Sequence, residues 1–258
     1  MNLTKKQIGN LSIAALAVIS VLLFFFVPPI EQNVSYHQFS DTDIFFNIPN
    51  TLNVLSNVFF LIFGWMGLVQ VCKNDKLYIV SENRYAYITL FLGVTFVSFG
   101  SGYYHLNPTN LTLVWDRLPM TVGFMGLVSI IISEFISVRL GKTLLLPLLL
   151  LGGLSVFYWY ITEMQGRGDL RPYALVQFLP VVAIPIILLT HRSRFENINH
   201  YWWLILSYVL AKIFEHYDQV IHEYILIISG HSLKHISAAI GIYAVIKGYQ
   251  VNKTNNSM

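Results

Sequence analysis

The sequence contains little charge. Of its 258 residues 11% are charged and 55% are hydrophobic, whereas about 25% of an ordinary soluble domain is charged. This composition excludes a soluble globular protein. Sixteen Lys and Arg against thirteen Asp and Glu give a net charge of +3, which is too small and too dispersed for the basic face of a nucleic-acid-binding protein.

Cysteine is almost absent. With Cys72 alone, an internal disulfide, a thiolate metal cluster and a dithiol redox pair are excluded, so a metal here needs histidine and carboxylate ligands. The sequence also lacks low-complexity tracts, a repeat of fixed period and long polar linkers. We therefore expect one compact membrane domain.

Long apolar runs are abundant. A bilayer core of about 30 Å is crossed by roughly 20 apolar residues in a helix. Eight runs of this kind lie near residues 9–27, 51–71, 85–106, 113–138, 143–161, 173–190, 200–216 and 231–248. They predict an all-α integral membrane protein with eight spans. The seventh run is the weakest, because it carries Lys212 and Glu215 at its end.

The first run allows two interpretations. It follows Lys5 and Lys6, as the apolar part of a secretory signal does. It leads into Pro28 and Pro29, however, without a small-residue cleavage pattern. We therefore expect a retained transmembrane anchor.

The positions of Lys and Arg predict the orientation. With eight spans and the N-terminus inside, eleven of these residues lie in inner segments and two, Arg167 and Arg171, in outer loops. Cytoplasmic loops are enriched in Lys and Arg, so both termini are expected in the cytoplasm. The other three, Arg117, Lys212 and Lys234, lie within spans or at their ends.

Ionisable side chains in spans are costly and mark functional candidates. Ser101 and His105 are four residues apart, so they share one face of their helix near its outer end. Asp116 follows at the outer start of the next span. A carboxylate there can act in chemistry or simply cap its helix, and its position alone leaves both readings open.

A second polar group begins the last span. His231 and His235 are four residues apart, which places two imidazoles on one face at a separation that a single metal ion bridges. The alternative is two interfacial histidines bonded to loop carbonyls. The predicted orientation brings both to the depth of His105 and Asp116, and this coincidence favours a metal site.

Three histidines with an open fourth position are typical of catalytic zinc, with iron and manganese as alternatives. Such a metal activates water and polarises a carbonyl oxygen. Asp116 is then the predicted general base. Ser101 is expected to donate to the oxyanion or to hold the carboxylate.

The remaining polar residues have simpler explanations. Three asparagines share a helix face, and we expect them to form interhelical hydrogen bonds rather than to contact substrate. They are Asn50, Asn53 and Asn57. An ion-paired cap at the outer rim is expected from Lys212, Glu215 and Asp218. Lys234 is expected to face away from the site and to extend towards the outer surface.

The spacing of the candidate site residues resembles that of the alkaline ceramidase family. This family belongs to a superfamily of seven-helix membrane hydrolases that includes the progestin and adipoQ receptors. Its pattern is a Ser and a His four apart on one helix, an Asp at the start of the next, and two His four apart on the last. The matching residues are Ser101, His105, Asp116, His231 and His235.

Two further segments carry the resemblance, which covers roughly residues 36–248. The string Asp-Arg-Leu-Pro-Met at 116–120 is similar to the Asp-variable-Leu-Pro-Met string of ceramidases. The polar and glycine pattern of the family's first core helix looks like Asn53, Ser56, Asn57, Gly64 and Gly67.

The resemblance implies hydrolysis of the ceramide amide bond to a sphingosine-type base and a fatty acid, with zinc held by the three histidines. It also implies a seven-helix core preceded by an additional helix. Residues 1–30 are then an N-terminal transmembrane anchor, 31–250 a ceramidase-like hydrolase domain and 251–258 a short polar tail.

Eukaryotic ceramidases also bind calcium, through an Asp-Trp-Cys-Glu stretch before the first core helix. This chain lacks that string. Glu31, Asp41 and Asp43 occupy the corresponding loop in a different pattern, which argues against calcium.

We therefore predict a zinc-dependent intramembrane amidase for ceramide or a related N-acyl lipid, which enters sideways between helices. The site is expected near the outer face of a bacterial inner membrane. Three alternatives stay open: a lipid esterase using the same site, a non-enzymatic lipid or hormone receptor of the adipoQ-receptor type, and a transporter. The oligomeric state is not predicted.

Overall fold

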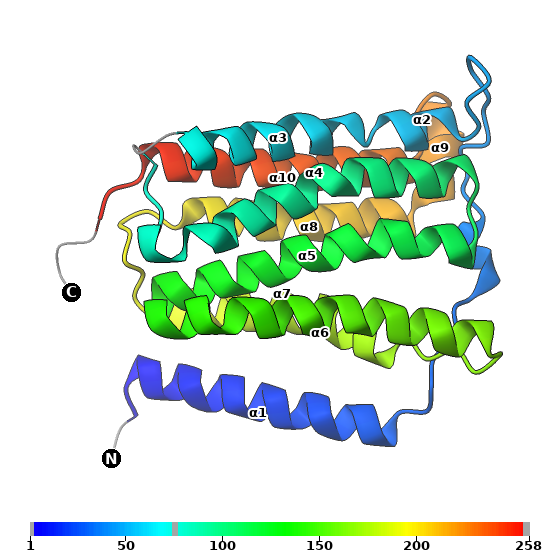
Figure 1. Ribbon diagram of the computed structural model, residues 1–258. Coiled ribbons are helices and arrows are strands. Elements are labelled where there is room, and N and C mark those ends of the chain that lie inside the picture. Colours follow the sequence, from blue (N-terminus) through cyan, green and yellow to red (C-terminus); the bar gives the residue numbers. More distant parts are fainter. Residues whose placement is uncertain (1–2, 74–76, 255–258) are drawn as a thin grey trace.

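The protein is a bundle of long helices that lie side by side (Figure 1). The computed structural model describes residues 3–73 and 77–254, and within these ranges the only β-structure is two isolated bridges. The α-helices are α1 (Lys5–Phe26), α2 (Thr51–Leu55), α3 (Val58–Lys73), α4 (Arg84–Leu106), α5 (Asn110–Phe135), α6 (Val138–Met164), α7 (Arg171–Thr190), α8 (Asn199–His216), α9 (Asp218–Ile225) and α10 (Gly230–Val251).

Each predicted apolar run is helical, which confirms the all-α class. Among the described residues six helices are long and apolar enough to cross a membrane, counting α2 with α3 as one, and the bent pair of α9 and α10 gives a seventh. The protein is thus a multi-pass membrane protein. Helix α8 is not among these candidates, so the count of eight spans stays a prediction.

The second predicted run differs from the expected continuous helix. It is interrupted between α2 and α3, at Ser56 and Asn57. The Ser56 hydroxyl donates to the carbonyl of Asn53 at 3.2 Å, and the Asn57 amide donates to the same carbonyl at 2.8 Å. These side-chain bonds use a carbonyl that an unbroken helix would pair with a backbone N–H.

The bundle has two distinct ends. Helix α1 begins and α10 finishes at one end, whereas α4 ends and α5 and α10 begin at the other, beside α2 and α9 (Figure 1). We call the second the α9 end. Side chains fix the helix starts there: Thr109 and Thr112 form a capping box for α5, and the Ser229 hydroxyl accepts from the backbone N–H of Ser232 at the start of α10.

Helices α4 and α5 approach closely through glycine. A Cβ atom on Gly100 would overlap the carbonyl of Trp115, and one on Gly93 would overlap the backbone of Gly123. Only glycine permits this separation of the two backbones. The contact at Gly100 brings Ser101 on α4 next to Asp116 on α5.

Helix α1 packs on α7 at the edge of the bundle (Figure 1). Near its beginning, Gly9 lies so close to Thr190 that a Cβ atom would overlap that side chain. At the next residue, the Asn10 amide oxygen lies 3.1 Å from Nε2 of His191. These contacts fix the end of α1 that is remote from the α9 end.

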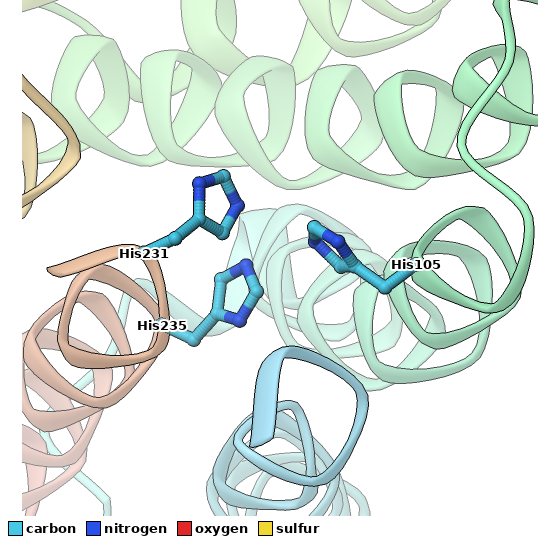
Figure 2. A group of neighbouring side chains, drawn as sticks. All are labelled: His105, His231 and His235. Atoms are coloured by element: carbon cyan, nitrogen blue, oxygen red, sulfur yellow. The ribbon is translucent and has the colours of Figure 1, made fainter. Parts of the chain in front are cut away.

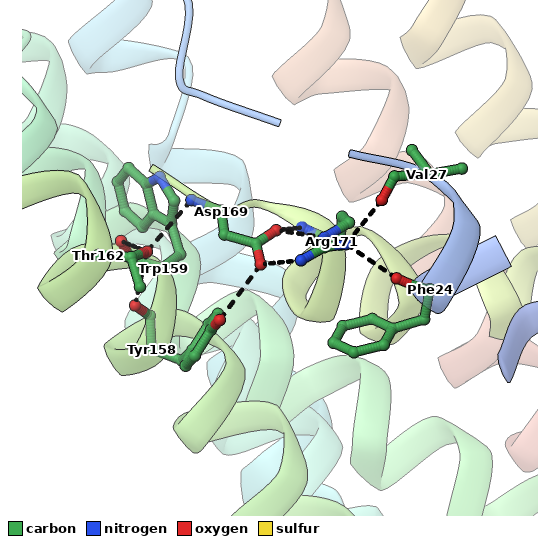
Figure 3. A network of polar contacts seen from close by, with 7 residues as sticks. All are labelled: Phe24, Val27, Tyr158, Trp159, Thr162, Asp169 and Arg171. Carbon is green, nitrogen blue, oxygen red and sulfur yellow. Dashed lines mark hydrogen bonds and ion pairs between the residues drawn. The ribbon is translucent and has the colours of Figure 1, made fainter. Parts of the chain in front are cut away.

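The other end of α1 is held by Arg171 (Figure 3). Its Nη1 atom donates to the carbonyls of Phe24 at 2.9 Å and Val27 at 2.6 Å. Asp169 forms an ion pair with Arg171 at 2.7 Å and also accepts from the Tyr158 hydroxyl at 3.2 Å. Hydrogen bonds from Arg171 hold the pKa of Asp169 below its ordinary value. The last turn of α1 is therefore tied to the loop before α7.

Arg171→Met should loosen α1, because the carbonyls of Phe24 and Val27 lose their donor. We expect a lower melting temperature of the purified protein than that of wild type. Arg167→Met is the matched control, since the Arg167 guanidinium donates to the nearby Gln165 side chain and not to α1 within the described residues. Equal melting temperatures for the two variants would contradict the proposed clamp.

The ion pair of Asp169 and Arg171 also predicts a pH effect. Because the pKa of Asp169 is lowered in the folded protein, the pair stabilises the fold above the ordinary carboxyl pKa. This stabilisation is lost as the pH falls through the lowered pKa. The difference in melting temperature between wild type and Arg171→Met should therefore shrink below about pH 4.

Candidate metal centre

Three buried histidines meet at the α9 end of the bundle (Figure 2). His105 comes from the last turn of α4, and His231 and His235 from successive turns of α10. One ring nitrogen of each lies within 4.8 Å of the others, and the ring centroids are 4.9 to 5.1 Å apart. Within the described chain they are the one group of three His, Cys, Asp or Glu side chains that can hold a metal ion.

The chemistry of this donor set fits a metal. The buried Nδ1 of His105 has no hydrogen-bond partner among the described residues. A buried polar atom without a partner is costly, and a cation that accepts its lone pair removes the cost. Neutral imidazoles at tetrahedral separations are ligands that zinc prefers.

The tautomer of His235 is set by a neighbouring hydroxyl. Nδ1 of His235 lies 2.8 Å from the Ser56 hydroxyl oxygen, and that hydroxyl donates its own proton to the carbonyl of Asn53. The hydroxyl must then accept from Nδ1, which places the ring proton there and leaves the Nε2 lone pair free. Such outer-shell bonds orient metal-binding histidines.

Asn53 connects this region to the start of α10. Its side-chain oxygen accepts from the hydroxyls of Ser229 at 3.1 Å and Ser232 at 2.8 Å. Its backbone N–H, like that of the preceding residue, donates to the Asp41 carboxylate, which caps α2. The Asn50 amide donates to the carbonyl of His105 at 2.8 Å. The expected interhelical bonds of Asn50 and Asn53 are confirmed, whereas the Asn57 amide bonds within its own segment.

The capping interpretation of Asp116 is wrong. Helix α5 begins at Asn110 under the Thr109 cap, so Asp116 lies in the second turn. The carboxylate is a close neighbour of the Ser101 side chain, with which it lines a common cavity, and it is almost fully buried. It is not part of the histidine group, which leaves it available for proton transfer beside that group.

A cavity of about 360 Å³ leads away from this site into the bundle. Ser101, Asp116 and His235 line one end, and Tyr201 lies at the other. The wall between them is apolar and comes from α4, α5, α7, α8 and α10, with Leu90, Val94, Leu127, Ile184, Leu204 and Ile242. Along α4 the lining from position 101 to 90 spans roughly 16 Å, because a helix rises 1.5 Å per residue.

The charged residues at the α9 end differ in part from expectation. Lys212 and Glu215 pair at 2.6 Å, as predicted, but Asp218 instead accepts from the backbone N–H of His231 at 2.7 Å. The expectation for Lys234 was wrong. It lines the cavity, pairs with Glu215 at 2.6 Å and brings its ammonium to 3.4 Å from Nε2 of His231. The attraction of a partly buried carboxylate outweighs extension to the surface.

Sequence reasoning missed the segment between α1 and α2. The Phe39 ring lies 4.6 Å from the ring of His105 and 4.5 Å from that of His231. The Gln32 side-chain oxygen accepts a hydrogen bond at 2.6 Å from Arg117, the residue that follows Asp116 in the sequence. An isolated Phe or Gln in a loop has no periodicity or spacing that marks it, so no local signal was available.

The fold and the site together describe a multi-pass membrane protein with a buried histidine cluster beside a Ser–Asp pair. Residues 43–258 match the ceramidase family, and the chain therefore belongs to this family. Membership confirms the resemblance and implies a hydrolase that acts on an amide, with ceramide-like lipid as the substrate. Helix α1 and Phe39 lie outside the matched residues. No curated protein and no solved structure matches the chain.

Ser56→Ala should weaken metal binding about 10- to 100-fold, because the ring of His235 loses the partner that fixes its tautomer. The affinity is measured by competition with a chelator. Ser237→Ala is the matched control, since Ser237 lies on α10 like His235 and its hydroxyl donates to the carbonyl of Ser207 on α8, away from the histidines. His235→Ala should lose the stoichiometric metal altogether. Unchanged metal content in that variant would contradict the three-histidine site.

Proposed function

We propose that the protein is a zinc-dependent intramembrane amidase that hydrolyses the N-acyl bond of ceramide or a related N-acyl lipid. The products are a free fatty acid and an amine base. The observation that carries this proposal is the group of three buried histidines beside the Ser101–Asp116 pair, both at one cavity, in a chain of the ceramidase family.

The proposed residues divide the chemistry between them. His105, His231 and His235 would hold the zinc, which when bound lowers the pKa of water and polarises a carbonyl. Asp116 accepts the proton of the attacking water and returns it to the leaving amine, as a general base and then acid. Ser101 holds the carboxylate in place. Because Ser101 lines the cavity, its hydroxyl can also donate a hydrogen bond to the oxyanion.

The cavity suits the acyl chain of a lipid. Its wall is mainly apolar between the site and Tyr201, which favours a chain that extends into the bundle with its amide at the polar end. We propose that the lipid enters sideways between α7 and α8, where Lys212 lies 5.8 Å from the ring of Phe178. A substrate then reaches the site without leaving the bilayer.

The topology and domain limits are also proposals. Residues 1–30 form a membrane anchor, 31–250 the hydrolase domain and 251–258 a polar tail, with both termini in the cytoplasm. This orientation places the site at the periplasmic face of a bacterial inner membrane. It is supported by the positions of Lys and Arg and by the location of the site at the end of the bundle remote from the start of α1.

Asp116→Asn should lower the release of fatty acid from an N-acyl sphingoid lipid about 10²- to 10⁴-fold, because the amide cannot accept the proton of water. Bound metal should stay near wild type, since the histidines are untouched. Asp43→Asn, at an exposed carboxylate, is the matched control. A chelator should abolish the wild-type activity and added zinc should restore it.

Two results would overturn this assignment. Metal-replete wild type that binds ceramide without turnover would favour the receptor interpretation, and faster cleavage of an acyl ester than of the matched amide would favour an esterase. Loss of metal from Asp116→Asn would make Asp116 a ligand rather than a base.

A green fluorescent protein fused after Met258 should be fluorescent, because this reporter folds in the cytoplasm and not after export in an unfolded form. An alkaline phosphatase inserted at Gly166, in the loop between α6 and α7, should be active on the opposite side. The reverse pattern would place the histidine cluster at the cytoplasmic face.

A further inference from the structure

The ionisable groups of the cavity are not balanced in charge. Besides His235, three cationic side chains and two carboxylates line it, namely Arg117, Lys212, Lys234, Asp116 and Glu215. One positive charge is therefore left over within the cavity wall, before any metal is counted. An uncompensated charge in a low-dielectric surrounding is costly, and an anionic ligand would remove that cost.

The lysines retain free hydrogen-bond donors. Lys212 bonds to Oε2 of Glu215 and Lys234 to Oε1, both at 2.6 Å, so a single carboxylate serves two ammonium groups. Each ammonium has three N–H donors. Lys212 uses one of them on Glu215, and Lys234 uses one on Glu215 and a second on Nε2 of His231, so each retains at least one. Their side chains are 39% and 20% exposed, so both remain accessible to a ligand.

Arg117 adds positive potential, and it forms no ion pair with the residues that the structure describes. Nη2 donates to Gln32, while the buried Nη1 has no hydrogen-bond partner within the described chain. The guanidinium lies 4.2 Å from the ring centroid of Trp159 and 4.6 Å from that of Tyr173. These aromatic rings enclose it, so it acts on a ligand through its field rather than by direct contact.

The position of the lysines identifies the part of the lipid that meets them. If the acyl chain extends towards Tyr201 and the amide lies at the histidines, the remainder of the molecule is at the α9 end, where Lys212 and Lys234 lie. We propose that the substrate is an N-acyl lipid whose amine portion carries an acidic group, a sulfonate, carboxylate or phosphate, bound by Lys212 and Lys234. This inference rests on the proposed function and specifies its substrate class.

The test compares two amides that differ only in head-group charge. N-palmitoyltaurine has a sulfonate where N-palmitoylethanolamine has a hydroxyl, and palmitate represents the released acid. Binding is measured to full-length, metal-loaded Asp116→Asn protein in phosphatidylcholine nanodiscs, because this background prevents turnover. We expect the taurine amide to bind about tenfold more tightly, as one added charge-assisted hydrogen bond implies.

Substitutions give effects of opposite sign. Lys212→Gln and Lys234→Gln should reduce the preference for the taurine amide, whereas Glu215→Gln should increase it by removing the competing carboxylate. A merely structural role of the cluster would lower binding in every case. Lys247→Gln, near the other end of α10 beside Tyr243, is the matched control and should leave the preference unchanged.

The outcomes separate this inference from the proposed function. Equal affinity for the two amides, or a decrease in Glu215→Gln, overturns the acidic head group. Palmitate binding that depends on the lysines, together with equal affinity for both amides, assigns the lysines to the product and also overturns it. If wild type releases no fatty acid but the charge preference persists, the amidase proposal fails and the anionic subsite stands.

Discussion

The geometry of the site depends on the hydrogen bond between His235 and Ser56. It sets which ring nitrogen of His235 is free, and it exists because the helix is interrupted between α2 and α3. The carbonyl of Asn53 accepts a hydrogen bond from the Ser56 hydroxyl. The Asn53 side-chain oxygen accepts hydrogen bonds from Ser229 and Ser232 at the start of α10. Little water is available at this depth to replace these partners, so each bond constrains the next.

Local periodicity explains why much of the site was predictable. The apolar runs predicted the positions of the long helices. Two residues four apart on a helix share one face whatever surrounds them. The pair of His231 and His235 therefore followed from sequence, and the counts of Lys and Arg brought His105 and Asp116 to the same depth. The resemblance supplied the ceramidase assignment, which the family match over residues 43–258 confirms.

Contacts between distant segments explain what was missed. Lys234 turns inward because Glu215, 19 residues away on another helix, attracts it. Gln32 reaches Arg117 across 85 residues of sequence, and Phe39 covers two of the histidines from a loop outside the family match. Such positions are set by three-dimensional packing, and neither propensity nor spacing encodes them locally. The break between α2 and α3 is another feature that no local sequence pattern predicted.

The clamp on α1 has a consequence for biosynthesis. Arg171 follows Phe24 by 147 residues, so the partner of this helix does not exist when α1 leaves the ribosome. At about 5–20 residues per second the delay is on the order of ten seconds, during which α1 lacks its contacts with α7. Only 11% of the residues in its most apolar stretch are buried, so α1 depends little on its neighbours during this delay. Completion of the bundle is thus a late step that follows the emergence of α7.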